Sequence, residues 1–239
     1  MKTILFLYNS SDYGPAPWLA AGYRVVSVDY DDTDHASTVR ARGGHPYHHR
    51  LNIDLSRGPC SVAEINDTLD HLGYESPCFI MSYAPCTDLA VCGNRSRIEK
   101  LKRDGGVVRR ALTNARLVEH WACPSIVENP VSILATHWKK PTGYVHPWQF
   151  SDLCPDGPHP EFPDLIPERD LYPKKTGLWC QNGALLPVPV KSDPPAKQDF
   201  FGYARLGGKS ARTKYIRSLS PRGMSVAIFL ANHGIISQT

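Results

Sequence analysis

Five short apolar runs, each followed by polar residues, constrain the fold of this chain more than any other feature. They cover residues 3–8, 23–29, 51–55, 77–82 and 124–128. Continuous apolar runs of this length are typical of strands that are buried on both faces of a parallel sheet. A short helix predicted over 15–22, ended by Gly22, joins the first two runs, and the second run closes on Asp29. This order predicts an open α/β sheet whose ligand crevice lies at the carboxyl ends of its strands.

The remaining sequence predicts further elements around this sheet. Helical spacing covers 62–72, a basic helix is expected over 95–120 with an interruption at Gly105-Gly106, and a strand is expected over 176–180. Ser220-Pro221 caps a final helix over 222–233. Residues 131–175 are rich in proline, which favours irregular structure, and 187–204 are typical of a linker. We therefore expect an α/β domain over 1–130, a loop-rich region over 131–204, and a basic segment with the last helix over 205–239.

The charge of the chain is modest, but its distribution is uneven. The 239 residues suit one α/β domain and carry a formal net charge of +4. Six cations and no acid fall between residues 205 and 222. Such a block is typical either of a phosphate-binding surface or of a solvated basic tail.

Cysteine and histidine usage points away from disulfides and metals. The seven cysteines form no C-x-x-C pair, and no zinc-ligand spacing is present. Six of them are interpreted as buried structural residues: Cys60, Cys78, Cys92, Cys123, Cys154 and Cys180. His45, His48 and His49 are interpreted as surface-loop residues, whereas His137, His146 and His159 are candidates to line the mouth of a site. Because no apolar run approaches the ~20 residues of a membrane span, we expect a cytoplasmic protein without a membrane or metal partner.

Four reactive or acidic side chains follow the predicted strands in chain order. They are Asp29, Asp54, Cys86 and Glu128. Any one of them is more often a helix cap or a turn residue, but four in order, each after its own strand, indicate a site at one sheet edge. Cys86 follows Pro85 after a buried strand, which is a good setting for an activated thiol.

Two segments resemble sequence motifs of the DNA cytosine-5 methyltransferases. Residues 84–90, Ala-Pro-Cys-Thr-Asp-Leu-Ala, resemble the Pro-Cys-Gln-x-Phe-Ser loop of that family, and 127–130, Val-Glu-Asn-Pro, resemble its Glu-Asn-Val motif. Segments 146–150, 174–179 and 207–223 resemble shorter, mostly phage-borne relatives, so that the expected compartment is then the host cytoplasm. The resemblance covers most of the chain, with freer sequence between the matches.

The resemblance implies a Rossmann-like fold, S-adenosylmethionine as cofactor and cytosine-containing DNA of either strandedness as partner. Cys86 would attack C6 of cytosine, while Glu128 would hold N3 and the exocyclic amine. The residues that it implies for the cofactor are Tyr8, Asn9, Ser10, Gly14, Asp29, Tyr30, Asp54, Leu55 and Pro85. Those that it implies for DNA are Asn129, Lys174, Lys175, Thr176, Lys209, Arg212, Lys214, Arg217 and Arg222.

The chain departs from the family pattern at three places. Residues 8–14, Tyr-Asn-Ser-Ser-Asp-Tyr-Gly, replace a Phe-x-Gly-x-Gly loop, so that only Gly14 remains. Lys174-Lys175-Thr176 is the nearest counterpart of a Gln-x-Arg-x-Arg motif, and little length remains for target recognition. Two alternatives therefore stay open: modification of a free cytosine nucleotide or with a variant donor, and a catalytically silent DNA-binding anti-restriction protein.

Overall fold

The computed structural model describes residues 1–30, 39–41, 45–90, 98–100, 102, 104–191, 193–194 and 210–237, of which 39–41, 211 and 237 are described by their backbone alone. Within this part of the chain, eight strands form one mixed sheet in the order β3-β4-β2-β1-β5-β6-β8-β7. The strands are β1 (Thr3–Leu7), β2 (Arg24–Asp29), β3 (Val39–Ala41), β4 (His48–Asn52), β5 (Phe79–Ser82), β6 (Ser125–Pro130), β7 (Gly143–Val145) and β8 (Thr176–Gln181).

A parallel block forms the centre of the sheet, and antiparallel strands extend it on both sides. Neighbours within β4-β2-β1-β5-β6 are all parallel. β3 pairs antiparallel with β4 at one edge, and β8 pairs antiparallel with both β6 and β7 at the other. The carboxyl ends of five strands therefore meet along one side of the sheet.

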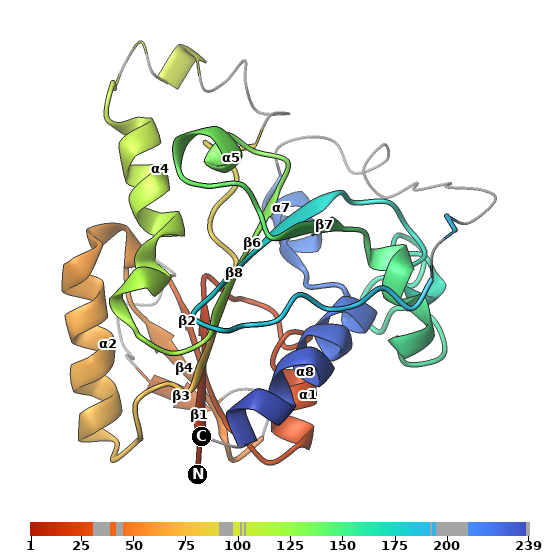
Figure 1. The fold of residues 1–239 in the computed structure, drawn as a ribbon, viewed down its shortest axis with the longest axis horizontal. Coiled ribbons are helices and arrows are strands. Elements are labelled where there is room, and N and C mark those ends of the chain that lie inside the picture. The colour runs from red at the N-terminus through yellow and green to blue at the C-terminus, as the bar shows by residue number, and fades with distance from the viewer. Residues whose placement is uncertain are drawn as a thin grey trace.

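Helices cover both faces of the sheet. The α-helices are α1 (Ala16–Ala20), α2 (Pro59–His71), α4 (Val107–Ala115), α5 (Leu134–His137), α7 (Ala211–Ser218) and α8 (Arg222–Ser237). The 3-10 helices are η1 (Leu55–Arg57), η3 (Leu117–His120), η4 (Pro147–Leu153) and η5 (Glu168–Asp170). α2 and α4 cover one face, whereas α1 and α8 cover the other (Figure 1).

The continuous apolar runs follow from this arrangement, because a central strand must supply two cores. In β1, Leu5 and Leu7 pack into the core under α2 and α4, while Ile4 and Phe6 pack into the core under α1 and α8. Successive side chains of a strand point to opposite faces, so a strand covered on both sides carries no polar alternation. The expected open α/β sheet, compatible with a Rossmann-like fold, is confirmed.

Several predicted elements have different bounds in the structure. The strand expected over 51–55 is β4 at His48–Asn52, so Asp54 and Leu55 lie in the turn and the 3-10 helix that follow. The basic helix expected over 95–120 is interrupted at Gly105-Gly106 as predicted, with helical residues at 98–100 and 102 before the interruption. After it, α4 ends at Ala115, and the 3-10 helix η3 takes the place of the expected last turn. β3, β7 and α7 were not predicted. The antiparallel strands β7 and β8 fall within 131–204 yet belong to the same sheet as residues 1–130.

Candidate functional site

A pocket of about 200 Å³ lies at the carboxyl edge of the parallel strands. Six residues expected to bind a cofactor line it: Tyr8, Asp29, Tyr30, Asp54, Leu55 and Pro85. They follow β1, β2, β4 and β5, which are neighbours in the sheet. Parallel strands place the residues after their carboxyl ends on one side of the sheet, which is why residues so far apart in sequence share this pocket.

Two carboxylates give the pocket a negative character. Asp29 accepts a hydrogen bond from the backbone N of Tyr30 at 3.0 Å, and Asp54 caps η1 by accepting from the backbone N of Ser56 at 2.9 Å. Burial, followed by the charges of Asp54 and Asp29, raises the pKa of Tyr8, so its phenol stays protonated. The ring of Tyr30 is about half exposed at the rim, where it offers an aromatic surface.

Ser56 and Asn114 also line the pocket, although the sequence did not point to them. Ser56 follows Asp54 in η1, so the shift of the strand to His48–Asn52 brings it to the edge. Asn114 comes from α4, and its backbone oxygen lies 3.4 Å from the donating hydroxyl of Tyr8. No motif marks a residue that enters a site from a covering helix, because only packing places it there.

The other three residues expected to bind the cofactor, Asn9, Ser10 and Gly14, do not line this pocket. Gly14 instead packs against Tyr83 and Phe6. A Cβ atom at this position would lie 2.7 Å from Oη of Tyr83 and 3.0 Å from the ring of Phe6. The glycine is therefore required by close packing rather than by approach to this pocket.

Cys86 is exposed on the loop after β5, next to the pocket-lining Pro85. Its backbone oxygen accepts hydrogen bonds from the amides of Leu89 at 3.0 Å and Ala90 at 2.7 Å, which closes a tight turn. The buried side chain of Asn129 donates to the backbone oxygen of Ala84 at 2.8 Å. Asn129 thus ties the end of β6 to the loop that carries Cys86, a tether rather than a direct contact with DNA.

Glu128 lies at the end of β6, beside the Cys86 loop. The register pairs Val127 of β6 with Ser82 of β5, so Glu128 follows directly where β5 passes into that loop. Glu128 is only 7% exposed, and its Oε1 atom has no hydrogen-bond donor among the described residues. Nζ of Lys174 lies 3.7 Å away and provides a compensating charge. A buried carboxylate oxygen in this state can accept a hydrogen bond from an incoming N–H group.

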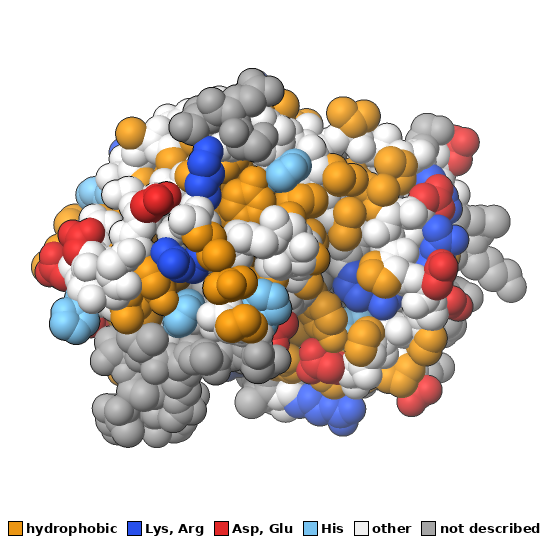
Figure 2. Space-filling model, turned by 90° about the horizontal axis from the view of Figure 1, so that it is seen from below, with side chains coloured by type: hydrophobic (Ala, Val, Ile, Leu, Met, Phe, Trp, Pro, Cys, Tyr) orange, Lys and Arg blue, Asp and Glu red, His pale blue; other side chains and the backbone are white. Residues whose placement is uncertain are grey.

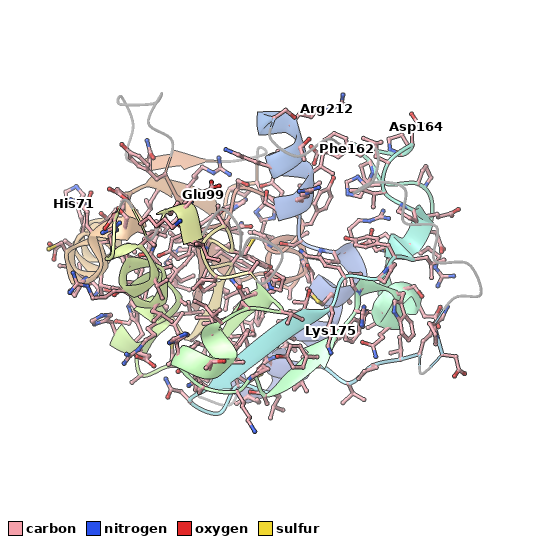
Figure 3. All side chains as sticks on the ribbon, turned by 90° about the horizontal axis from the view of Figure 1, so that it is seen from above. His71, Glu99, Phe162, Asp164, Lys175 and Arg212 are labelled. Atoms are coloured by element: carbon pink, nitrogen blue, oxygen red, sulfur yellow. The ribbon has the colours of Figure 1, made fainter. Side chains whose placement is uncertain are left out.

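The segment 174–176 reaches the same edge because β8 begins there. Thr176 pairs with Pro130 at the end of β6, and its hydroxyl donates to the backbone oxygen of Lys174. Lys175 is exposed, and its Nζ lies 4.8 Å from the centre of the Tyr144 ring. Figure 3, which views the molecule from above, shows Lys175 near the start of β8 and Arg212 on α7.

The basic segment divides into an exposed part and a buried part. Arg212 and Lys214 are exposed on α7, whereas Arg217 is half-buried. Lys209 lies outside the described residues. On the face seen from below, the Lys and Arg side chains of the described residues are scattered rather than gathered into one patch (Figure 2).

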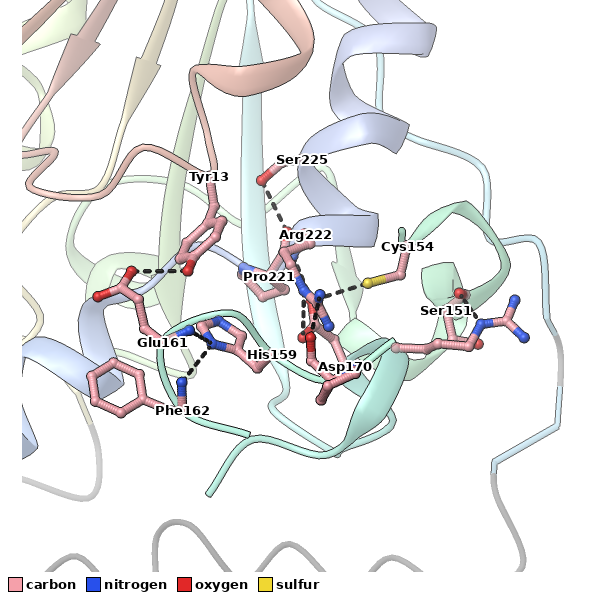
Figure 4. A network of polar contacts seen from close by, with 12 residues as sticks. Tyr13, Ser151, Cys154, His159, Glu161, Phe162, Asp170, Pro221, Arg222 and Ser225 are labelled. Carbon is pink, nitrogen blue, oxygen red and sulfur yellow. Dashed lines mark hydrogen bonds and ion pairs between the residues drawn. The ribbon is translucent and has the colours of Figure 1, made fainter. Parts of the chain in front are cut away.

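Arg222 is not a surface cation, which corrects its assignment to DNA. It is 6% exposed, and its Nε lies 3.5 Å from Oδ1 of Asp170, which is 2% exposed. Its backbone N also donates to Asp170, and Cys154 lies against the same carboxylate (Figure 4). The pair anchors the start of α8 to η5, so phosphate has no access to it.

Histidine and cysteine assignments change in the same way. His48 is 2% exposed within β4, and His159 is 2% exposed between the rings of Tyr13 and Phe162, so neither is a surface or mouth residue. Cys60 is exposed on α2 rather than buried, and Cys92 lies outside the described residues. Where the structure describes side chains, no group of three His, Cys, Asp or Glu residues could hold a metal ion.

No α-helix in the described ranges has the length and apolar character needed to cross a membrane. Neither the protein-family models nor the curated proteins contain a match to this chain.

Proposed function

We propose that this protein is an S-adenosylmethionine-dependent methyltransferase that acts on C5 of cytosine in DNA, with Cys86 as nucleophile. One observation carries the proposal: the acidic pocket shares Pro85 with the Cys86 loop, and Glu128, whose Oε1 has no hydrogen-bond donor among the described residues, lies on the neighbouring strand β6. A nucleoside pocket, a thiol and an acid are thereby adjacent along one edge of the sheet.

The pocket residues suit the adenosine part of the cofactor. Carboxylates such as Asp29 and Asp54 accept hydrogen bonds from ribose hydroxyls or an adenine amine, and Tyr30 and Leu55 offer faces for the purine ring. The volume of about 200 Å³ is below the 300–1,000 Å³ common for whole small-molecule sites. It therefore matches a nucleoside better than the complete cofactor, whose remaining part would extend toward Cys86.

Cys86 and Glu128 then have separate roles at the cytosine base: Cys86 is the nucleophile, and Glu128 interacts with N3. The Cys86 thiolate forms a bond to C6, and the electron pair displaced from the C5–C6 double bond is delocalised toward N3 and O2. A proton that Glu128 donates to N3 neutralises this charge and returns to Glu128 when Cys86 leaves. When bound, the cofactor supplies an electrophilic methyl group to C5. Loss of the C5 proton to a base then restores the double bond and expels Cys86. Cytosine in duplex DNA must first be flipped out of the stack.

Transfer of a tritiated methyl group to unmodified DNA tests this proposal. The wild-type protein is expected to label cytosine, whereas Cys86→Ala and Glu128→Gln are expected to reduce labelling by about 10³-fold or more. Cys60→Ala is the matched control, because Cys60 is a second exposed thiol, on α2. Equal labelling by wild type and Cys86→Ala, or label recovered in adenine, would overturn the proposal.

A free cytosine nucleotide is the second candidate substrate. The observation that favours it is that β7, β8 and η4 are built into the main body, which leaves only short segments of 131–204 for contact with DNA. Incubation with dCMP in parallel with DNA separates the two, because nucleoside mass spectrometry shows which of them gains a methyl group on C5.

A further inference from the structure

The loop between β1 and α1 is held by side-chain hydrogen bonds to neighbouring strands. Asn9 is 2% exposed, and its amide Nδ2 donates to the backbone oxygen of Ser11 at 2.8 Å and to Oγ of Ser27 at 3.1 Å. Ser27 lies on β2, so the first residue after Tyr8 is bound directly to the neighbouring strand. Tyr8 itself has a φ of 55°, a left-handed conformation that a tyrosine adopts only when its surroundings hold it there.

Residues of a second strand, β4, also contact this loop and its partner Ser27. Oγ of Ser27 lies 3.0 Å from Nε2 of the buried His48, and Nδ1 of His48 lies 3.7 Å from Oδ1 of Asp12. Two positions along β4, Nη2 of Arg50 donates to the backbone oxygen of Ser10 at 2.8 Å. Asn9 is therefore bound to β2, and Ser10 and Asp12 have partners on β4. Ser11 is bound to β2 indirectly, through Asn9.

The alternation of β4 explains why these two residues act together. His48 and Arg50 are two apart and share one face of the sheet, the face toward α1. His49 points to the other face, where its Nε2 lies 2.9 Å from the hydroxyl of Tyr74, in the turn that follows α2. One strand thus carries two adjacent histidines of which only one can reach the loop.

We propose that His48 and Arg50 are positioning residues that hold loop 9–12 in the shape that binds the cofactor beyond its adenosine part. The proposal rests on the function given above. Glycines would let backbone amides approach the ligand by having no side chains, but they would leave the loop free in the absence of ligand. Here a fixed polar network orders the loop before binding, which lowers the entropy lost when the ligand binds.

The two parts of the ligand give a test that separates positioning from general stability. Under the proposed function, adenosine would contact only the pocket of Asp29 and Asp54, whereas the longer S-adenosylhomocysteine would also pass loop 9–12 on its way toward Cys86. By isothermal titration calorimetry, His48→Ala is expected to weaken S-adenosylhomocysteine about tenfold or more and to leave adenosine within about twofold. His49→Ala is the matched control and is expected to change neither affinity.

Arg50→Met provides a second variant in case His48→Ala does not fold, because Arg50 is only partly buried and methionine keeps the apolar stem. The same selective loss is expected from it. Equal weakening of both ligands, or no weakening of either, in a folded variant contradicts the positioning role.

Hydrogen exchange separates failure of this inference from failure of the proposed function. If the wild-type protein binds neither ligand, the cofactor assignment fails. The positioning role then predicts that amides of residues 10–12 exchange slowly in the free wild-type protein and at least about tenfold faster in Ser27→Ala. Unchanged exchange in Ser27→Ala would show that the network does not order the loop.

Discussion

The pocket at the carboxyl edge and the basic C-terminal segment were both expected from the sequence to bind ligands. Most of the expected pocket residues lie together in the structure, whereas the expected cations are divided between exposed and buried positions. Six of the expected cofactor residues line one pocket. Of the expected phosphate-binding cations, Arg212 and Lys214 are exposed, whereas Arg222 is buried against Asp170. A residue at a strand tip is placed by the backbone of the sheet, whereas a long cationic side chain is placed by whichever carboxylate packs beside it.

Replacement of the buried cation is expected to have the largest effect. Arg222→Met leaves Asp170 buried without its counter-charge, which costs about 3–5 kcal/mol in the free energy of unfolding. Arg212→Met, at an exposed position of α7, is expected to change it by less than about 0.5 kcal/mol. Urea unfolding of both variants measures the difference, and similar midpoints would contradict the division into buried and exposed cations.

The next effect concerns the pocket. Asp29→Asn keeps an oxygen for the amide of Tyr30 but loses the charge, so S-adenosylhomocysteine is expected to bind about tenfold more weakly with little change in stability. Asp67→Asn, an exposed position on α2, is the control and is expected to bind normally. Titration calorimetry of the two variants checks this, and equal affinities would remove Asp29 from the site.

Acid is expected to weaken the packing beneath the basic segment. Burial and the charge of Arg222 lower the pKa of His159 to about 4, although Glu161 raises it. The unfolded chain therefore takes up a proton first, so the free energy of unfolding falls by up to about 2 kcal/mol as the pH drops from 7 to 5. Asp170 acts in the opposite direction, because burial raises its pKa.

His159→Asn isolates this contribution. An asparagine oxygen can replace Nδ1 as acceptor for the amides of Glu161 and Phe162, and it does not titrate. Urea unfolding at both pH values is expected to show a smaller loss of stability in the variant. The same loss in both proteins would assign the acid sensitivity to other groups.

The smallest effect concerns salt. If Arg212 meets a phosphate, Arg212→Gln lowers the slope of log K against log salt by about 0.9 for duplex DNA. Arg109→Gln, at an exposed position on α4, is expected to leave the slope unchanged. Fluorescence anisotropy over a series of salt concentrations gives both slopes, and equal values would place the DNA away from α7.

The sequence predicted the central sheet because each strand carries its own apolar run. It placed Asp29 and Asp54 at the pocket edge because each follows a predicted strand, whereas Tyr8, Tyr30, Leu55 and Pro85 were expected there from the family resemblance. It did not predict β3 or β7, which are short edge strands whose three residues resemble loops. It placed His48 on the surface because a polar stretch surrounds it, although its ring is satisfied by Ser27 and Asp12. It missed Asn114 because a helix residue enters a site only through packing.

The glycine-poor loop shows the same limit of sequence patterns. Its residues Asn9 and Ser10 read as departures from a binding motif, but in the structure they contact Ser27 and Arg50. A pattern records which residues are present, whereas the partners that hold them come from distant strands.

Covalent trapping on DNA that contains 5-fluorocytosine tests the central claim most directly. Fluorine at C5 cannot leave as a cation, so a nucleophile at C6 remains bound after methyl transfer. With S-adenosylmethionine present, the account predicts a denaturation-resistant protein–DNA adduct whose cross-linked peptide contains Cys86, and no adduct with Cys86→Ala. A wild-type protein that binds this DNA without forming an adduct, as a catalytically silent binding protein would, contradicts it.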